Sequence, residues 1–114
     1  MKKFLFDSDF IIWYLGGREK EIKYLQELSK VGDFYISVVT ITEVRTGLTK
    51  DTVKIIKLLK DTFTTVPVTE NIAELAGVFK QKYILDIADM MIAATAVITQ
   101  SKLVTYNKKH FPMK

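Results

Sequence analysis

The sequence predicts a three-layer α/β/α sandwich around a central, mainly parallel sheet of four or five strands. Short apolar segments typical of strands alternate along the whole chain with longer segments of helical periodicity. Helical crossovers join parallel strands, so this alternation favours a parallel sheet covered on both faces. With 114 residues and 48% hydrophobic content, the chain is long enough for one compact core, and we expect a single domain over residues 1–114.

The first half of the chain is expected to hold two strands and three helices. Gly16-Gly17 stops the first helix, and Gly32-Asp33 closes the second one before the next strand begins. The predicted strands are Lys2–Phe6 and Phe34–Val39, and the predicted helices are Ser8–Leu15, Glu19–Val31 and a third that Thr40 caps and that ends near Gly47.

The second half continues the alternation. A helix over Asp51–Asp61 should point Ile55, Ile56, Leu58 and Leu59 inward, and Pro67 suggests that the following strand lies at a sheet edge. The next helix shows the amphipathic series Ile72, Leu75, Ala76, Phe79 and Tyr83. The helix after it is apolar on nearly all sides, which predicts deep burial. The ranges are a strand over Thr64–Val68, the buried helix over Ile87–Thr99, and a last strand over Lys102–Tyr106.

Composition narrows the possible functions. The chain has no cysteine, which excludes disulfides, thiolate nucleophiles and cysteine-based zinc sites. Asp7 interrupts the apolar start, and no apolar run approaches the roughly 20 residues needed to cross a bilayer, so we expect a cytoplasmic protein without membrane association. A net charge of +4 favours a polyanionic partner without requiring one.

Three acidic residues follow predicted strands. Asp7 comes directly after the first strand, Glu43 follows the second, and Asp89 lies in the first turn of the buried helix. The carboxyl ends of parallel strands share one edge of a sheet, so these side chains should converge there. Further polar residues are expected at the same edge as possible support: Ser8, Asp9, Asp86 and Asn107.

A converging set of carboxylates predicts a metal site. Like charges held close together repel one another, and a bound cation compensates them. Hard ions such as Mg²⁺ or Mn²⁺ take oxygen ligands and retain water, and a retained water can attack a phosphodiester. The sequence therefore favours metal-dependent phosphodiester hydrolysis.

Helix capping offers a competing interpretation of these residues. Thr40-x-x-Glu43 fits a capping box, and Asp86-x-x-Asp89 fits a cap followed by an acid in the first turn. Ser8 is equally suited to cap the first helix. His110 is the only histidine and is best explained as a surface or packing residue, while Trp13 and Tyr14 are expected in the core.

Four blocks of the sequence together resemble PIN-domain proteins, and in size and spacing the VapC-like toxins of toxin–antitoxin pairs. Each block joins a strand or helix start to a polar residue, and the four occur in the family's order. They are Phe4–Ile12 around Asp7, Ile36–Val44 around Glu43 with Gly47, Asp89–Ala96, and Leu103–Asn107 continuing to His110-Phe111.

This resemblance implies a PIN fold and a Mg²⁺- or Mn²⁺-dependent endoribonuclease whose acidic centre is Asp7, Glu43 and Asp89. It also implies an RNA substrate, a cognate antitoxin and a homodimer. The chain departs from the pattern in two ways. Many relatives carry a fourth acid at the position of Asn107 or His110, and Asp9 stands where Asn is usual. One metal ion is therefore favoured over two.

Three rival functions remain open at this point. The missing fourth acid is compatible with a catalytically degenerate PIN scaffold that binds RNA or protein. Asp7-Ser8-Asp9 after an apolar strand resembles the nucleophile motif of haloacid-dehalogenase-type phosphatases, although Ile11 stands where those enzymes have Thr or Val. A receiver-like signalling domain would need an aspartate after the middle strand, where Thr69-Glu70-Asn71 offers none.

Overall fold

The computed structural model describes residues 1–106, 109 and 111–113, and its centre is a parallel sheet. Within this part of the chain the sheet has four strands in the order β3-β2-β1-β4, and all neighbouring strands run parallel. The predicted α/β fold with a parallel sheet is therefore confirmed. The strands are β1 (Lys2–Phe6), β2 (Gly32–Ser37), β3 (Thr64–Val66) and β4 (Lys102–Val104).

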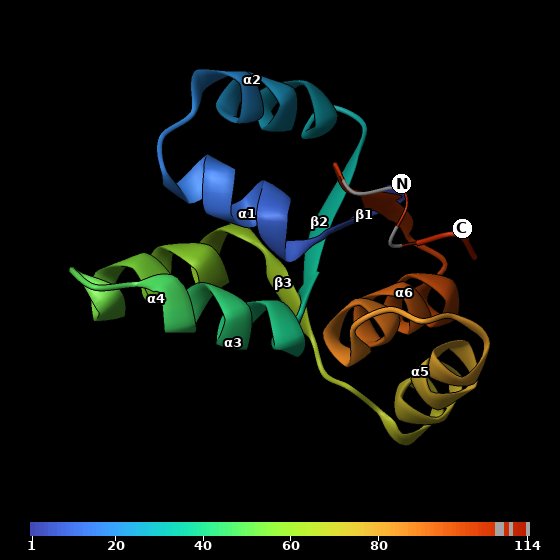
Figure 1. Cartoon of the computed structure of the whole chain (residues 1–114). Coiled ribbons are helices and arrows are strands. Elements are labelled where there is room, and N and C mark those ends of the chain that lie inside the picture. Colours follow the sequence, from blue (N-terminus) through green and yellow to red (C-terminus); the bar gives the residue numbers. More distant parts are fainter. Residues whose placement is uncertain (107–108, 110, 114) are drawn as a thin grey trace.

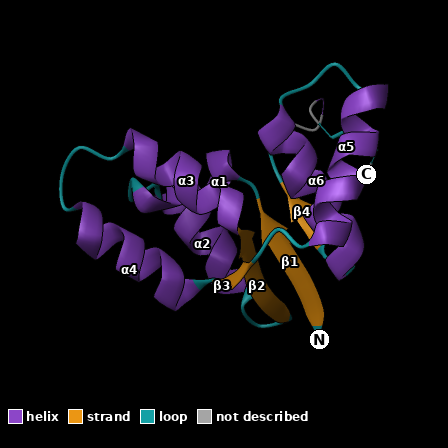
Figure 2. Cartoon of the chain, turned by 90° about the horizontal axis from the view of Figure 1, so that it is seen from below, coloured by secondary structure: helices purple, strands orange, loops and turns teal. Residues whose placement is uncertain are grey.

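Helices cover both faces of this sheet. Helices α1 to α4 lie on one side, and α5 and α6 lie on the other (Figures 1 and 2). The clusters of buried side chains agree with these layers, because one joins α1 to α4 with the sheet and two others centre on α5 and α6. The helices are α1 (Ser8–Leu15), α2 (Glu19–Leu28), α3 (Val38–Gly47), α4 (Thr52–Thr62), α5 (Glu70–Lys82) and α6 (Ile87–Thr99).

The alternation of side chains along β1 explains the two layers. Phe4 and Phe6 face the α1 to α4 layer, while Leu5 faces α6. Phe6 is the centre of an aromatic cluster, with ring centroids 5.0 Å from Phe10 and 5.4 Å from Phe63. Such ring contacts add to the stabilisation that apolar burial provides.

Helix α6 is buried where the sequence predicts it. Met90 and the run from Ile92 to Ala96 are buried against the sheet and α5. The small alanines let the helix approach its neighbours closely. Both ends of the helix are nevertheless exposed at Ile87, Val97 and Ile98, so its burial is less complete than predicted.

Several predicted boundaries are wrong by a few residues. Helix α2 ends at Leu28 rather than Val31, and β2 begins at Gly32, two residues before the predicted start. Gly32 pairs with Lys2 on β1, and the two backbones are so close that a Cβ at Gly32 would lie 2.5 Å from the Lys2 carbonyl oxygen. β3 and β4 are also shorter than predicted, ending at Val66 and Val104.

Two predictions of burial also fail. Leu58 is half exposed on α4, and Trp13 is 48% exposed on α1 rather than in the core. The guanidinium of Arg18 lies 4.3 Å from the centre of the Trp13 ring, so this indole packs against a cation at the surface. Tyr14 is partly buried against the main core cluster, as predicted. β3 lies at the sheet edge, as Pro67 suggested, although Pro67 itself follows the strand.

Within the described residues, no helix is both long enough and apolar enough to span a lipid bilayer.

Candidate functional site

Asp7 is a buried acidic residue whose two carboxylate oxygens are both hydrogen bonded. It follows β1 and is the N-cap of α1, where its Oδ1 accepts a 3.1 Å hydrogen bond from the Phe10 N–H. Its Oδ2 accepts a hydrogen bond from the Thr105 hydroxyl. The strand register pairs Phe6 with Val104, which places the next residues, Asp7 and Thr105, side by side. Both oxygens of a carboxylate that is only 4% exposed are thus held in place.

The charge of Asp7 is disfavoured by its surroundings. Burial raises the pKa of Asp7 above its ordinary value of 3.8, and the nearby charges of Asp9 and Glu43 raise it further. The hydrogen bonds from Thr105 and Phe10 act in the opposite direction without cancelling the effect of burial. A cation beside this carboxylate would compensate its negative charge and would lower its pKa again.

The start of α3 differs from the prediction and changes the interpretation of Glu43. Ser37 is the N-cap, with its hydroxyl accepting a 3.1 Å hydrogen bond from the Val39 N–H, so Thr40 does not cap this helix. Glu43 then lies beyond the first turn, and the capping-box explanation for it is wrong. Its carboxylate instead accepts a hydrogen bond from the buried Ser8 hydroxyl of α1.

Ser8 connects the first two sequence blocks. Its hydroxyl lies within hydrogen-bonding distance of Glu43 Oε1 and 3.3 Å from the Thr40 hydroxyl, which is fully buried. The predicted capping role of Ser8 belongs to Asp7, so Ser8 is free to bridge α1 and α3. The structure therefore brings Asp7, Ser8 and Glu43 together at one edge of the sheet.

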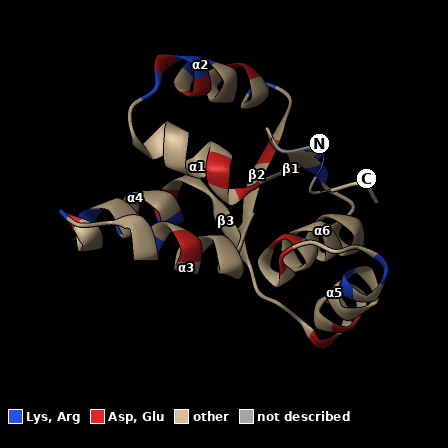
Figure 3. Cartoon of the chain, viewed as in Figure 1, with Lys and Arg blue, Asp and Glu red and all other residues tan. Residues whose placement is uncertain are grey.

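Asp86 and Asp89 lie at the start of α6. Asp86 is the N-cap residue, as predicted, yet among the described residues its side chain accepts no capping hydrogen bond. Asp89 is partly buried in the first turn. Helix α3 contacts both α1 and α6, and Figure 3 shows acidic residues on all three helices. Asp9 is exposed in the first turn of α1.

The placed side chains do not form a closed metal cage. Among residues 1–106, 109 and 111–113, no three Asp, Glu or His side chains form a group that could hold one metal ion. The hydrogen bonds that hold Asp7 and Glu43 turn these carboxylates toward Thr105 and Ser8. The three-carboxylate metal site remains a prediction, and Asn107 and His110 lie outside the described residues.

The sequence interpretation assigned no role to Thr105 and the wrong role to Thr40. Thr105 could have been found from its place directly after the last strand. Residues that follow parallel strands lie at the same edge of the sheet, so Thr105, after β4, is expected near Asp7, after β1. The contact between Thr40 and Ser8 depends on how α3 packs on α1, which no sequence motif specifies.

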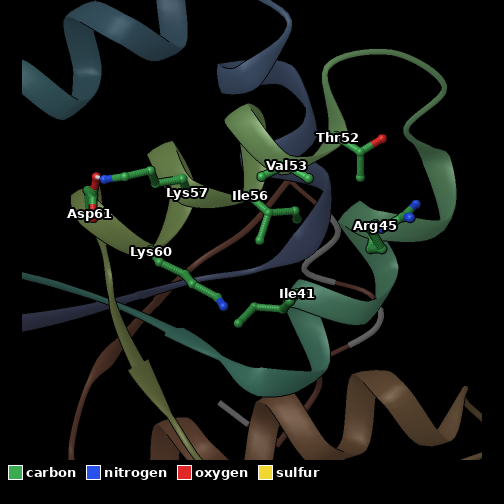
Figure 4. A pocket seen from close by; sticks show the side chains of 8 residues that line it. All are labelled: Ile41, Arg45, Thr52, Val53, Ile56, Lys57, Lys60 and Asp61. Atoms are coloured by element: carbon green, nitrogen blue, oxygen red, sulfur yellow. Dashed lines mark hydrogen bonds and ion pairs between the residues drawn. The ribbon is translucent and has the colours of Figure 1, made fainter.

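One of the cavities along the described chain lies away from these acids. It has a volume of about 530 Å³ and lies between α3 and α4, lined by the apolar side chains of Ile41, Val53 and Ile56 and by the cationic ones of Arg45, Lys57 and Lys60 (Figure 4). None of the predicted site residues lines it. A second cavity, of about 350 Å³, is lined by Phe10 and Thr105, the two residues that donate hydrogen bonds to Asp7.

Comparison with known sequences gives a consistent result. Residues 4–112 match the PIN domain family. The chain is 34% identical to ribonuclease VapC10 of Mycobacterium tuberculosis, in an alignment that covers 96% of this chain and 86% of that protein. It is 28% identical to ribonuclease VapC19 of the same organism, covering 96% and 92% of the two chains.

Solved structures show the same similarity in three dimensions. A chain of a toxin–antitoxin complex from Klebsiella pneumoniae superimposes with a TM-score of 0.80 at 30% identity, covering 94% of this chain and 88% of that one. The VapBC2 complex from Rickettsia felis, bound to a DNA fragment from its promoter, gives a TM-score of 0.83 at 16% identity, covering 97% and 92%. At 16% identity, the similarity to the Rickettsia felis complex shows a shared fold and nothing more.

Proposed function

This chain belongs to the PIN domain family, and we propose that it is a metal-dependent endoribonuclease acting as the toxin of a toxin–antitoxin pair. The observation that carries the proposal is the buried Asp7 carboxylate beside Glu43, at the carboxyl edge of a parallel sheet, in a chain related to a ribonuclease. The family match does not support the phosphatase or receiver interpretations.

The residues present suit a hard divalent cation. The candidate site offers carboxylate and hydroxyl oxygens from Asp7, Ser8 and Glu43, and the raised pKa of Asp7 reflects a carboxylate that lacks compensation for its charge. Asp7, Glu43 and Asp89 would hold Mg²⁺ or Mn²⁺. Such an ion, when bound, lowers the pKa of a coordinated water and stabilises charge on a phosphoryl oxygen.

The protein's own contribution is to hold these groups in place. Thr105 and the Phe10 N–H fix the plane of the Asp7 carboxylate, so it needs little rearrangement to act. Ser8 orients Glu43 across the gap between α1 and α3, where Glu43 either binds the cation or accepts a proton from the attacking water. The remaining possible supporters, Asp9 and Asp86, are exposed and add negative potential.

Two substitutions test the mechanism directly. Asp7→Asn and Asp89→Asn each remove one negative charge with little change of volume, and we expect either to lower metal-dependent RNA cleavage by ~100-fold or more. Purified protein is incubated with cellular RNA, with and without Mg²⁺ or Mn²⁺, and the new RNA ends are mapped. Asp33→Asn is the matched control, because Asp33 is exposed near the opposite end of β2. Undiminished cleavage by both variants would refute the mechanism.

A non-catalytic PIN scaffold is the second candidate. The observation that favours it is that no described trio of acidic side chains is arranged to hold a metal ion. A calorimetric Mn²⁺ titration combined with the cleavage assay separates the two proposals. Metal binding with cleavage supports the nuclease, whereas RNA binding without cleavage at any metal concentration supports the scaffold.

The proposal includes a homodimer, a cognate antitoxin and a cytoplasmic location. The antitoxin part is supported by the Klebsiella pneumoniae complex, whose name describes a toxin with its antitoxin. The homodimer and the location rest on the family resemblance alone. The neighbouring genes are read for a small antitoxin, and co-expression with its product should yield a copurifying complex that no longer cleaves RNA. Light scattering of the isolated chain then measures its oligomeric state.

A further inference from the structure

We propose that the cavity between α2 and the end of β4 binds one base of the RNA and an adjoining phosphate, next to the bond that is cut. We call it the α2–β4 pocket, and its principal side chains are Phe10, Tyr24 and Tyr106, with Lys20, Lys23 and Thr105 around them. This inference rests on the proposed ribonuclease function and adds a substrate-binding subsite to it.

The pocket adjoins the candidate catalytic carboxylate through two direct connections. Thr105 lines the pocket and donates its hydroxyl hydrogen bond to Asp7 Oδ2. Phe10 also lines the pocket, and its backbone N–H donates to Asp7 Oδ1. A nucleotide in the pocket would therefore lie next to a phosphodiester placed at Asp7.

Aromatic rings line this pocket. The Phe10 ring centre lies 5.8 Å from that of Tyr106 in a stacked arrangement, and 6.0 Å from that of Tyr24 in a tilted one. Phe10 is buried, but Tyr24 is 45% exposed and Tyr106 is 46% exposed. Exposed aromatic faces bind bases of any sequence by stacking, because every base has a π-face.

Tyr106 is anchored rather than loose at the surface. Its hydroxyl donates a hydrogen bond to Oε2 of Glu21, a carboxylate on α2 that is only 1% exposed. The Arg18 guanidinium lies 3.7 Å from the other oxygen of Glu21. A ring held in this way loses little conformational freedom when a base stacks on it.

The charges around the pocket suit a phosphate. Lys20 extends over the Tyr106 ring, with its Nζ 5.8 Å from the ring centre, and Lys23 is exposed on the same helix. Lys23 has an exposed ion pair with Glu19 at 3.1 Å, which a phosphate could replace at little cost. Glu27, the acidic residue of the lining, is 3.5 Å from Lys30. The cavity of about 350 Å³ is within the usual size of small-ligand pockets.

A double perturbation tests the assignment. Oligonucleotides that carry the mapped cleavage sequence are prepared intact or with a single abasic position on either side of the cut. Binding is measured by fluorescence anisotropy in the Asp7→Asn background. We expect one abasic position, or Tyr24→Ala, to weaken binding ~5- to 150-fold. Combining the two should add less than twofold, because both remove the same stacking contact.

Matched controls separate stacking and charge from general effects. Tyr24→Phe keeps the ring and should bind RNA within about twofold of the parent. Lys20→Ala should weaken binding and flatten its salt dependence, whereas Lys80→Ala, on the opposite layer, removes an equal charge and should do neither. Thermal melts verify that each variant is folded.

The outcomes distinguish this inference from the function on which it rests. If the wild-type protein cleaves no RNA, the proposed function fails, and the affinities of the wild-type protein and of Tyr24→Ala for intact single-stranded RNA still test the pocket. If cleavage occurs but Tyr24→Ala binds intact and abasic RNA like the parent, the pocket assignment is wrong. Loss of antitoxin capture by Tyr24→Ala, with RNA affinity unchanged, would also overturn it by assigning the pocket to a protein partner.

Discussion

Asp7 combines a structural role with the proposed catalytic one. As the N-cap of α1 it satisfies a backbone N–H, and as a buried carboxylate beside Asp9 and Glu43 it concentrates negative charge. An uncharged asparagine can still cap the helix, but it cannot supply the negative charge. Function and stability should therefore conflict at this residue.

We predict that Asp7→Asn is more stable than the wild-type protein at pH 7 in metal-free buffer. The pKa of Asp7 is raised in the folded state, so its contribution to stability is fully present below pH 3.8 and is lost as the pH rises through the folded-state pKa. Urea unfolding from pH 3.5 to pH 7 should show an advantage for the variant that grows with pH. An advantage that is the same at every pH would contradict this cause, and Asp33→Asn controls for removal of an acid elsewhere.

The pair formed by Tyr106 and Glu21 was not predicted from the sequence. The buried Glu21 carboxylate accepts the Tyr106 hydroxyl, and its Oε1 has no hydrogen-bond partner among the described residues. We expect Tyr106→Phe to lower the free energy of unfolding by ~1–3 kcal/mol, because it leaves a buried carboxylate without this donor. Tyr24→Phe, which loses a hydroxyl from the same pocket, should change stability by less than about 0.5 kcal/mol.

The same pair predicts a pH dependence at the alkaline end. Burial, followed by the hydrogen bond to Glu21, raises the pKa of Tyr106 from 10.0 to about 12. The resulting stabilisation is fully present below pH 10 and is lost as the pH rises through about 12. Spectrophotometric titration near 295 nm should detect one late tyrosine that is missing from Tyr106→Phe.

At the scale of elements, β1 and β2 approach each other unusually closely where Gly32 pairs with Lys2. An added Cβ at Gly32 would lie 2.5 Å from the Lys2 carbonyl oxygen and the Phe4 ring. Strand register at this point also sets where β2 ends, and hence where Ser37 starts α3 and where Glu43 faces Ser8.

Gly32→Ala should therefore lower the free energy of unfolding by ~1–3 kcal/mol, since the crowding involves backbone atoms that cannot move independently. Gly77→Ala is the matched control in α5, where an added Cβ meets nothing within 4 Å. That change should stabilise the protein by ~0.5–1 kcal/mol, because alanine is the better helix former. Chemical denaturation of both variants measures the difference, and equal stability of the two would contradict the crowding argument.

At the scale of the whole molecule, the sheet edge gathers groups from distant parts of the chain. Asp7 and Thr105 are 98 residues apart, and Ser8 and Glu43 are 35 apart, yet each pair is hydrogen bonded. A cation at this edge would bind the folded state and not the unfolded one. Metal binding should thus be visible as a gain in global stability.

We predict that Mg²⁺ or Mn²⁺ raises the melting temperature of the wild-type protein, with ~2.7 kcal/mol of stabilisation at a hundredfold excess over Kd. Asp7→Asn and Glu43→Gln should lose most of this gain, while Asp33→Asn should keep it. Differential scanning fluorimetry across a metal titration provides the measurement. An equal metal response in all of these proteins would show that the cation binds elsewhere.

The sequence by itself determined the order and type of the elements and the family. The bounds of β1, α1 and α6 are those predicted, because apolar periodicity and the Gly16-Gly17 stop are local signals. Asp7 and Glu43 were identified because each follows a strand of a parallel sheet, and the structure places them near one another. That inference needs only chain order and strand direction.

Only the tertiary structure decided which polar groups hold one another. The bridge from Ser8 to Glu43 and the bond from Thr105 to Asp7 depend on packing between elements that are distant in sequence. The buried Glu21 is the clearest case, because on a charged helix it resembles any solvated acid until Tyr106 covers it. Local patterns determine secondary structure, whereas hydrogen bonds across the sheet edge require the three-dimensional register of the strands.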